Sequence, residues 1–524
     1  MSDAPRVTVA GGGIAGLTAA LRLGERGYRV KLYEQKPVLG GNLGSRRAAD
    51  GVHLDVYPHM YGNWYHNFWR LLRDASGLER KKLFDSVSGV KQIRAGEFPQ
   101  FTGLTDMYST RYMLPNLFSG VGPASDMFVF GYSHVDLLAE RSCPTMLPND
   151  LTVGGFMSAR PYMTQRAADA VNTFITTVWS IPSYLVSADD YRTYHAYCVA
   201  DPIPGFWLAR GSAFDQVIGP LTKALEANGV KVFPNVQVTG VSCRDGRAAK
   251  ISFEDRPSEK VDELVLAVPP PALLQIVRSG KPGRRIIDSV PDLAELSRLQ
   301  TQAIPMLHVY FTGKLRRIPK EPVGLYQSRL GLAFTDISQV WEEASAFGDR
   351  TVLALSSSDP YGLPGTSDTD DAMAMLRELS EYLEFEPGSA WGQSTDIDWK
   401  RTRYDANVDA QLFVNQAGTD VWRPNTRYDA LSNVCFAGDF CQNRIGMTTI
   451  ESAVTTGLDA ANAVIDRRGI GTPVDVRTPR SPSQPLYVWL RYAWGPYAWA
   501  AKAFSEGRDL IKGAARHLLD SRRT

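Results

Sequence analysis

The chain has 524 residues, a formal net charge of +1, 44 % hydrophobic residues and 22 % charged residues. These values are typical of a globular protein with two or more domains, and the near-neutral charge argues against a nucleic-acid-binding protein. No uncharged apolar run reaches the roughly 18 residues of a membrane-spanning helix. Five scattered cysteines without a Cys-x-x-Cys pair predict no metal site and reduced thiols, as in a cytoplasmic protein.

The N-terminal elements follow the order strand, glycine-rich turn, helix, strand. The strands are expected at Arg6–Ala10 and 28–33, and the helix at 17–27. Residues 11–16 between them spell Gly-x-Gly-x-x-Gly, and Glu34 stands directly after the second strand. A glycine motif in this context predicts a dinucleotide-binding fold, whereas the same motif alone is weak evidence.

Each residue of this motif has a defined physical role. Gly11 allows the tight turn, Gly13 lets the backbone approach a pyrophosphate, and Gly16 lets the helix pack closely on the strand. The first N–H groups of the helix, near Ile14 and Ala15, would face the phosphates. Glu34, followed by Gln35, is placed to bind the hydroxyls of an adenosine ribose.

A second glycine pair, Gly40-Gly41, follows the acidic residue and would lie along the pyrophosphate of an extended cofactor. With this segment the sequence resembles the flavin-containing amine oxidase and phytoene desaturase superfamily, whose pattern is Gly-Gly-Arg-x-x-Ser/Thr. Gly41 and Ser45 match this pattern, while Asn42 stands where the family has Arg. We expect Arg46 or Arg47 to replace that contact. The resemblance implies FAD rather than NAD.

Two later segments support the same resemblance. After Arg210-Gly211-Ser212 we expect a helix at 214–228 and strands at 230–233, 236–241 and 263–268, and the resemblance places Val238 against the adenine. A strand at 433–437 then ends in Gly438-Asp439, and in the family this Asp holds the ribityl or pyrophosphate group. The helix expected at 448–465 would direct N–H groups near Thr449 and Ile450 at the pyrimidine end of the flavin.

Within the superfamily, the segments 181–188, 422–424, 433–439 and 446–454 look like the branch of ζ-carotene desaturase and the squalene-associated, hydroxysqualene dehydroxylase-like desaturases. Asp55 and His59 fit the Asp-x-Gly-x-His pattern of that branch. Tyr57 replaces its Gly, which implies a substrate that differs from a carotene.

Residues 57–69 are unusually aromatic. We predict that His59 and Tyr61 lie near the isoalloxazine as catalytic residues, and that Tyr57, Trp64 and Tyr65 form an apolar substrate wall. The alternative for each of these side chains is ordinary core packing.

The predicted fold is therefore α/β, with a discontinuous Rossmann-like FAD-binding domain and an inserted α+β substrate domain. We assign residues 1–75, 206–271 and 423–468 to the first domain, and 76–205 and 272–422 to the second. Residues 469–524 form a linker and an aromatic and basic helical tail, broken at Gly495-Pro496. Peripheral membrane contact, packing on its own domain and an oligomer contact all remain open for this tail.

The predicted function is FAD-dependent oxidation of a small apolar substrate, isoprenoid or lipid-like, by hydride transfer to flavin N5. The alternatives are a flavin amine oxidase, a flavin-dependent double-bond isomerase and a flavin-bearing binding protein without turnover. The expected location is the cytoplasm or the inner face of the membrane.

Overall fold

The computed structural model describes residues 5–48, 51–142, 144, 150–342 and 347–520, with side chains up to residue 515. Its central feature is a five-stranded parallel sheet in the order β10-β2-β1-β14-β22. These strands are β10 (Lys231–Phe233), β2 (Arg29–Tyr33), β1 (Arg6–Ala10), β14 (Glu263–Leu266) and β22 (Val434–Phe436). The sheet therefore combines three distant parts of the chain, and the predicted α/β fold class is confirmed.

Two helices pack together on this sheet, α1 (Ile14–Gly24) and α14 (Ile450–Arg468). Their close approach depends on Gly457, because a Cβ there would lie 2.4 Å from the carbonyl oxygen of Ala15. Helix α1 ends three residues earlier than predicted, and Gly27, with φ of +79°, helps to turn the chain into β2. The predicted helix at 214–228 begins as a π-helical turn, Phe214–Ile218, and continues as α9 (Gly219–Ala227).

Small sheets and short helices complete the dinucleotide-binding region. An antiparallel meander contains β11 (Val238–Arg244), β12 (Arg247–Phe253) and β13 (Glu259–Lys260). The neighbouring elements are β3 (Ser45–Arg47), β4 (His53–Asp55), β5 (Tyr61–Gly62), α2 (His66–Ser76), α3 (Arg80–Leu83), β6 (Phe84–Val87), β9 (Phe206–Ala209), α10 (Pro270–Arg278) and α11 (Ile286–Ser289).

A seven-stranded sheet forms the core of the second region, in the order β20-β16-β19-β18-β17-β7-β8. Its strands are β20 (Arg403–Asp405), β16 (Met306–Tyr310), β19 (Val352–Ser357), β18 (Leu332–Asp336), β17 (Val323–Leu325), β7 (Lys91–Ile93) and β8 (Thr102–Gly103). Helices α12 (Ile337–Val340) and α13 (Asp368–Ser380) accompany it, and β15 (Thr301–Gln302) pairs with β21 (Leu412–Phe413).

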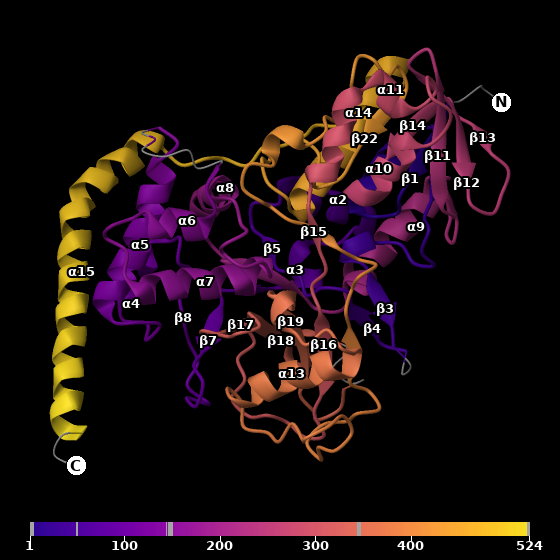
Figure 1. The fold of residues 1–524 in the computed structure, drawn as a ribbon. Helices are drawn as coiled ribbons and strands as arrows, with labels where there is room; N and C mark the ends of the chain where they lie inside the picture. The colour runs from indigo at the N-terminus through magenta and orange to yellow at the C-terminus, as the bar shows by residue number, and fades with distance from the viewer. Residues whose placement is uncertain (1–4, 49–50, 143, 145–149, 343–346, 521–524) are drawn as a thin grey trace.

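A helical layer lies to one side of this sheet (Figure 1). It contains α4 (Met113–Leu117), α5 (Ala124–Ala139), α6 (Val153–Ser158), α7 (Gln165–Trp179) and α8 (Ala188–Ala200). Four of the five cysteines, at positions 198, 243, 435 and 441, are buried free thiols, and Cys143 lies outside the described residues.

The C-terminal tail is one long helix, α15 (Gln484–Asp520), packed along α5 (Figure 1). The predicted break at Gly495-Pro496 is wrong, because contacts of Arg491 and Ser505 with α5 hold the helix on both sides of the proline. Tyr132 on α5 donates a hydrogen bond to the carbonyl of Arg491 at 3.0 Å, one turn before Pro496. None of the described helices, including α15, is both long enough and apolar enough to cross a bilayer.

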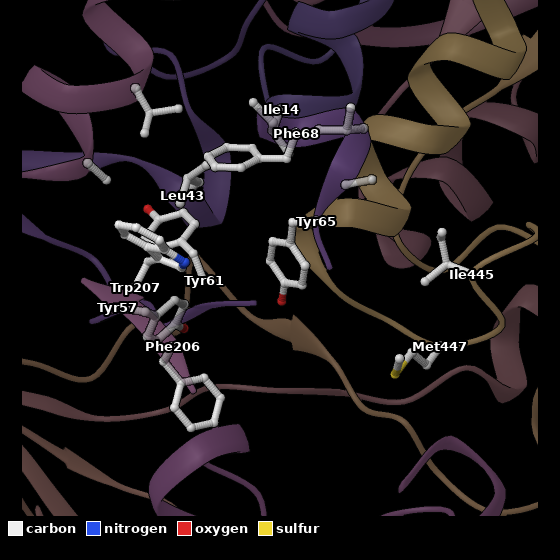
Figure 2. Packing of buried hydrophobic residues seen from close by; sticks show 14 of the residues in the cluster. Ile14, Leu43, Tyr57, Tyr61, Tyr65, Phe68, Phe206, Trp207, Ile445 and Met447 are labelled. Atoms are coloured by element: carbon white, nitrogen blue, oxygen red, sulfur yellow. The ribbon is translucent and has the colours of Figure 1, made fainter. Parts of the chain in front are cut away.

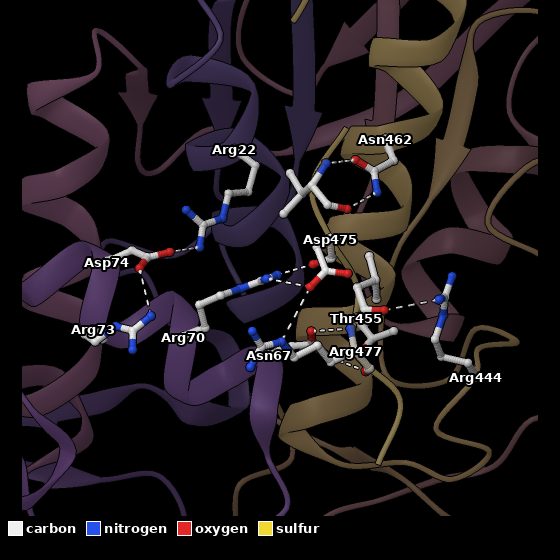
Figure 3. A network of polar contacts seen from close by, with 12 residues as sticks. Arg22, Asn67, Arg70, Arg73, Asp74, Arg444, Thr455, Asn462, Asp475 and Arg477 are labelled. Carbon is white, nitrogen blue, oxygen red and sulfur yellow. Dashed lines mark hydrogen bonds and ion pairs between the residues drawn. The ribbon is translucent and has the colours of Figure 1, made fainter. Parts of the chain in front are cut away.

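The segment between α14 and α15 is an extended strap held on the dinucleotide-binding region (Figure 3). Asn67 on α2 accepts from the N–H of Arg477 and donates to its carbonyl, at 2.9 and 2.7 Å. Asn462 on α14 forms the same pair of bonds with the backbone of Val474. These bonds fix the path of the chain towards α15.

Candidate functional site

A cavity of about 600 Å³ runs from the end of the parallel sheet to the helical layer. At one end it is lined by the loops after β1, β2, β14 and β22, and at the other by residues of α7, α8 and β9. Ligands of open α/β sheets bind outside the carboxyl ends of the strands, which is where this cavity begins.

The glycine turn leaves space for a cofactor at one position only. Gly11 has φ of +104°, and a Cβ there would lie 2.2 Å from the carbonyl oxygen of Ala267. A Cβ on Gly16 would lie 2.0 Å from the carbonyl oxygen of Gly11. Gly13 differs, because a Cβ there would meet no protein atom within 4 Å, although the residue lines the cavity. Gly11 and Gly16 thus serve the fold, while Gly13 keeps a surface open towards the cavity.

Glu34, which is predicted to bind the adenosine ribose, lies directly after β2 and in the cavity wall. Its carboxylate accepts hydrogen bonds from the N–H groups of Gly12 at 2.7 Å and Lys36 at 2.8 Å. These bonds fix the carboxylate beside the glycine turn. Val238, at the start of β11, lines the same end of the cavity.

Gly438-Asp439 meets the cavity at the end of β22. Gly438 has φ of +155°, and its N–H donates to the hydroxyl of Thr456 on α14 at 3.0 Å. Burial raises the pKa of Asp439 to about 6, and the nearby guanidinium of Arg423 partly opposes this shift. Arg423 also donates to the carbonyl groups of Asp439 and Phe440, which holds this turn in place.

The pKa of Asp439 predicts a pH effect on the apoprotein. Its folded value of about 6 lies above the unfolded value near 4. Ionisation of Asp439 therefore disfavours the folded state, so the contribution of this group to stability is greatest below about pH 4 and is lost as the pH rises through about 6. As the pH rises from about 4 to about 6, the free energy of unfolding of the wild type should fall by about 1–2 kcal/mol relative to that of Asp439→Asn, as measured by urea unfolding. The exposed Asp429→Asn variant is the control, and parallel pH curves for wild type and Asp439→Asn would contradict the prediction.

The N-terminus of α14 also points at the cavity. Thr449 is its N-cap and accepts from the N–H of Ser452 at 3.2 Å, and both Thr449 and Ile450 line the cavity. Asn415 holds the preceding loop, because it accepts from the N–H of Thr448 at 2.7 Å and donates to its carbonyl at 3.3 Å. A helix N-terminus in this position stabilises negative charge on a bound group.

The far end of the cavity is aromatic and aliphatic. Tyr57 and Tyr65 face it from the aromatic stretch, and Phe206 faces it from β9 (Figure 2). The Tyr57 hydroxyl donates to the carbonyl of Ala410, which leaves the ring as part of the wall. The other apolar lining side chains here include Met60, Val178, Trp179, Ile181, Tyr194, Ile304 and Met306.

His59 lies between this apolar end and a smaller side chamber of about 60 Å³. Burial lowers the pKa of His59 to about 4, so the imidazole is neutral at pH 7. The Nδ1 atoms of His59 and of His308, which also lines the chamber, are buried without a hydrogen-bond partner among the described residues. The chamber is large enough to hold water that could bond to these atoms.

The cavity brings most of the predicted site residues together. Those that line it are Gly11, Gly13, Ile14, Ala15, Glu34, Gln35, Gly41, Asn42, Tyr57, His59, Tyr65, Val238, Gly438, Asp439, Thr449 and Ile450. The structure places five others outside its lining: Gly16, Ser45, Arg46, Tyr61 and Trp64.

Arg46 has different partners from those we expected. It forms ion pairs with Asp405 and with Asp409, the second at 2.7 Å, and of these three residues only Asp409 lines the cavity. Asn42 lines the cavity but donates its side-chain amide to the carbonyl of Gln411 at 3.0 Å. Ser45 instead donates to Asp55 at 2.7 Å, and this bond joins β3 to β4.

Tyr61 and Trp64 belong to the aromatic core behind the wall. The Tyr61 ring packs on Phe68 and Phe84, and its side chain borders the side chamber rather than the main cavity. Trp64 packs edge-on against Tyr65. Tyr61 and Trp64 therefore support the wall from behind, as core packing would.

Several residues that line or support the site were missed in the sequence. Trp179 and Tyr194 lie on helices that are distant from the glycine motif in the chain, and no local pattern distinguishes them from core residues. Asn415 and Arg423 act on the backbone of the cofactor end. Arg423 lies within the segment 422–424, which resembles the family, and this resemblance was the signal that could have identified it as a site residue.

A parallel sheet of the dinucleotide-binding type, an open glycine position, a fixed carboxylate after the second strand and a helix N-terminus directed at the cavity together fit an extended flavin dinucleotide. They define the protein as a flavin-dependent oxidoreductase. Residues 179–465 match the model of the flavin-containing amine oxidoreductase family, and residues 9–75 match an NAD(P)-binding Rossmann-like domain. The chain belongs to the flavin-containing amine oxidoreductase family, and its cofactor is FAD.

Individual relatives agree with this assignment. A ζ-carotene desaturase from Synechocystis is 32 % identical, with 88 % of this chain and 97 % of the relative covered. A carotenoid φ-ring synthase from Streptomyces griseus is 26 % identical, with 89 % of each chain covered. The structure of cyclohexylamine oxidase from Brevibacterium oxydans has the same fold, with 14 % identity, a TM-score of 0.60, and coverage of 89 % of this chain and 100 % of that one.

Proposed function

We propose that this flavoenzyme oxidises a long apolar substrate of the isoprenoid or lipid class, in a desaturase-like reaction. The observation that carries the proposal is the distribution of charge in the cavity. Its charged lining residues in the described part of the chain are Glu34, Lys36, Asp409 and Asp439, which lie with the cofactor-binding segments. The aromatic and aliphatic end therefore favours a substrate without charge.

The relatives support the same substrate class. Two of them are named for reactions on carotenoids, which are long apolar isoprenoids. An amine oxidase is the nearest rival, since the family includes such enzymes. Among the described cavity residues, however, the single lysine is Lys36, whose ammonium binds Asp409 at 2.8 Å near the ribose end.

The chain's own residues would position the reactants and exclude water. When bound, FAD supplies the redox chemistry by accepting two electrons and a proton from a substrate C–H bond. Asp439 and the N-terminus of α14 would hold the cofactor, and the rings of Tyr57, Tyr65 and Phe206 would bury the substrate. His59, neutral and partly unpartnered, would accept the second proton released from the substrate.

Anaerobic mixing with squalene-type or carotene-type compounds tests the proposal. We expect the flavin absorbance to bleach with such a compound and to remain unchanged with simple amines. Product formation without net flavin reduction would indicate an isomerase instead. Retained FAD with no reduction by any isoprenoid or lipid would refute the proposed oxidation.

The role of His59 makes a separate prediction. His59→Gln should slow flavin reduction by about 10²-fold or more, because the proton acceptor is lost. FAD content should remain at the wild-type level, since His59 lies away from the phosphate and ribose contacts. His66→Gln, at the start of α2 and outside the cavity lining, is the control. Equal reduction rates for His59→Gln and wild type under stopped flow would exclude this role.

A further inference from the structure

Helix α15 is a fixed part of the molecular surface. Arg491 pairs with two buried carboxylates of the α5 end, Asp136 at 2.8 Å and Glu140 at 2.9 Å. Near the other end, Arg508 pairs with buried Asp126 at 2.9 Å, and Ser505 donates to the same carboxylate. Because these contacts hold one face of α15 against α5, its opposite face is presented to the surroundings along the helix (Figure 1).

The outward face carries exposed apolar side chains along its described length. Large ones are Leu486, Trp489, Tyr492, Tyr497, Trp499, Phe504, Leu510 and Ile511. Trp489, Tyr492 and Trp499 are 63 %, 67 % and 52 % exposed. No acidic residue occurs between Gln484 and Ser505. Isolated exposed apolar residues are common, but an ordered row of this length marks an interaction surface.

The residues of this face are arranged by depth. The helical period puts an uncharged set along its centre: Trp489, Ala493, Pro496, Ala500, Ala503 and Ile511. Tyr492, Trp499 and Leu510 lie along one edge of this set, and Tyr497 and Phe504 along the other. The central set and its two edges together form the outer stripe of α15. Lys512 is exposed near the C-terminal end of the helix, and Arg516 follows it one turn later in the sequence.

We infer that the outer stripe of α15 binds the surface of a lipid bilayer, with the helix axis parallel to the membrane. In that orientation the centre of the stripe enters the acyl boundary, and its edges lie at headgroup depth, where Trp and Tyr are preferred. Lys512 would then lie about one helix diameter or less from the headgroups, which is close enough to add attraction to an anionic surface.

The composition of the stripe favours a bilayer over a second copy of the chain. A helix pair in water needs branched aliphatic residues repeated at a and d positions, whereas the centre of this stripe is largely Ala, with Pro496 in the middle. The stripe also lies outside residues 9–75 and 179–465, which match the family models. The inference does not depend on the proposed substrate.

Flotation of the FAD-loaded full chain with vesicles of phosphatidylcholine and phosphatidylglycerol tests it. We expect the wild type to float with the vesicles, and the double variant Trp489→Glu, Ile511→Glu to bind at least about tenfold more weakly. The control carries the same added charge at exposed apolar positions elsewhere, Tyr361→Glu with Leu78→Glu, and should float like the wild type.

Both variants alter exposed side chains, so their flavin spectra and melting temperatures should match those of the wild type. A wild type that stays with the soluble fraction would overturn the inference. So would a stripe variant that floats as well as the wild type, or sedimentation that shows a wild-type dimer lost in the stripe variant while vesicle binding is unchanged.

Discussion

Gly13→Val is expected to abolish FAD binding while the protein still folds. Gly13 has φ of −72° and ψ of 172°, an extended conformation that any residue can adopt. A Cβ at this position meets no protein atom within 4 Å, so the apoprotein has room for the new side chain. That side chain would instead occupy the space into which the pyrophosphate must come close to the backbone. We expect affinity for FAD to fall by at least about 100-fold, or about 2.7 kcal/mol.

The measurement is the flavin content per chain after purification and titration with FAD, with the secondary structure followed by circular dichroism. Gly131→Ala is the matched control, since Gly131 on α5 is exposed and a Cβ there also meets nothing. It should keep wild-type FAD and stabilise α5 slightly. A Gly13→Val protein that retains stoichiometric FAD would show that the cofactor does not pass this glycine.

Arg491→Met is expected to cost about 3–5 kcal/mol of unfolding free energy, because it removes one of the two guanidinium groups that neutralise a pair of buried carboxylates. Arg491 and Arg160 together neutralise Asp136 and Glu140, and all four side chains are largely buried. Methionine retains much of the apolar stem of arginine but removes its charge. The two carboxylates would then share one guanidinium in a region from which water is excluded.

Urea unfolding of the two proteins provides the measurement. Arg244→Met is the control, because Arg244 forms an exposed pair with Asp245 and should change stability by no more than about 0.5 kcal/mol. The expected difference in unfolding free energy between the two variants distinguishes a buried ion-pair network from an exposed surface ion pair. If Arg491→Met is as stable as Arg244→Met, the ion pairs of Arg491 do not contribute to the stability of the folded protein.

The sequence by itself determined the cofactor end of the site. Strand β1, the glycine turn and Glu34 are adjacent in the chain, and each residue type is required there by local backbone geometry or by the ligand. The strand before Gly438-Asp439 and the helix after it were also predicted within a few residues, because their apolar patterns are strong. These local sequence patterns can be recognised without knowledge of the fold.

The tertiary structure decided the rest, because contacts between distant segments leave no local pattern. Arg46 turned from the expected phosphate position to Asp405 and Asp409, more than 350 residues away in the chain. Trp179, Tyr194 and Phe206 became cavity wall only when α7, α8 and β9 met the dinucleotide-binding region. Pro496 did not break α15, because α5 stabilises the helix on both sides of it. Local motifs predicted a dinucleotide site and their family resemblance implied FAD. Long-range packing determined which side chains line the apolar end of the cavity and which face of the last helix is exposed.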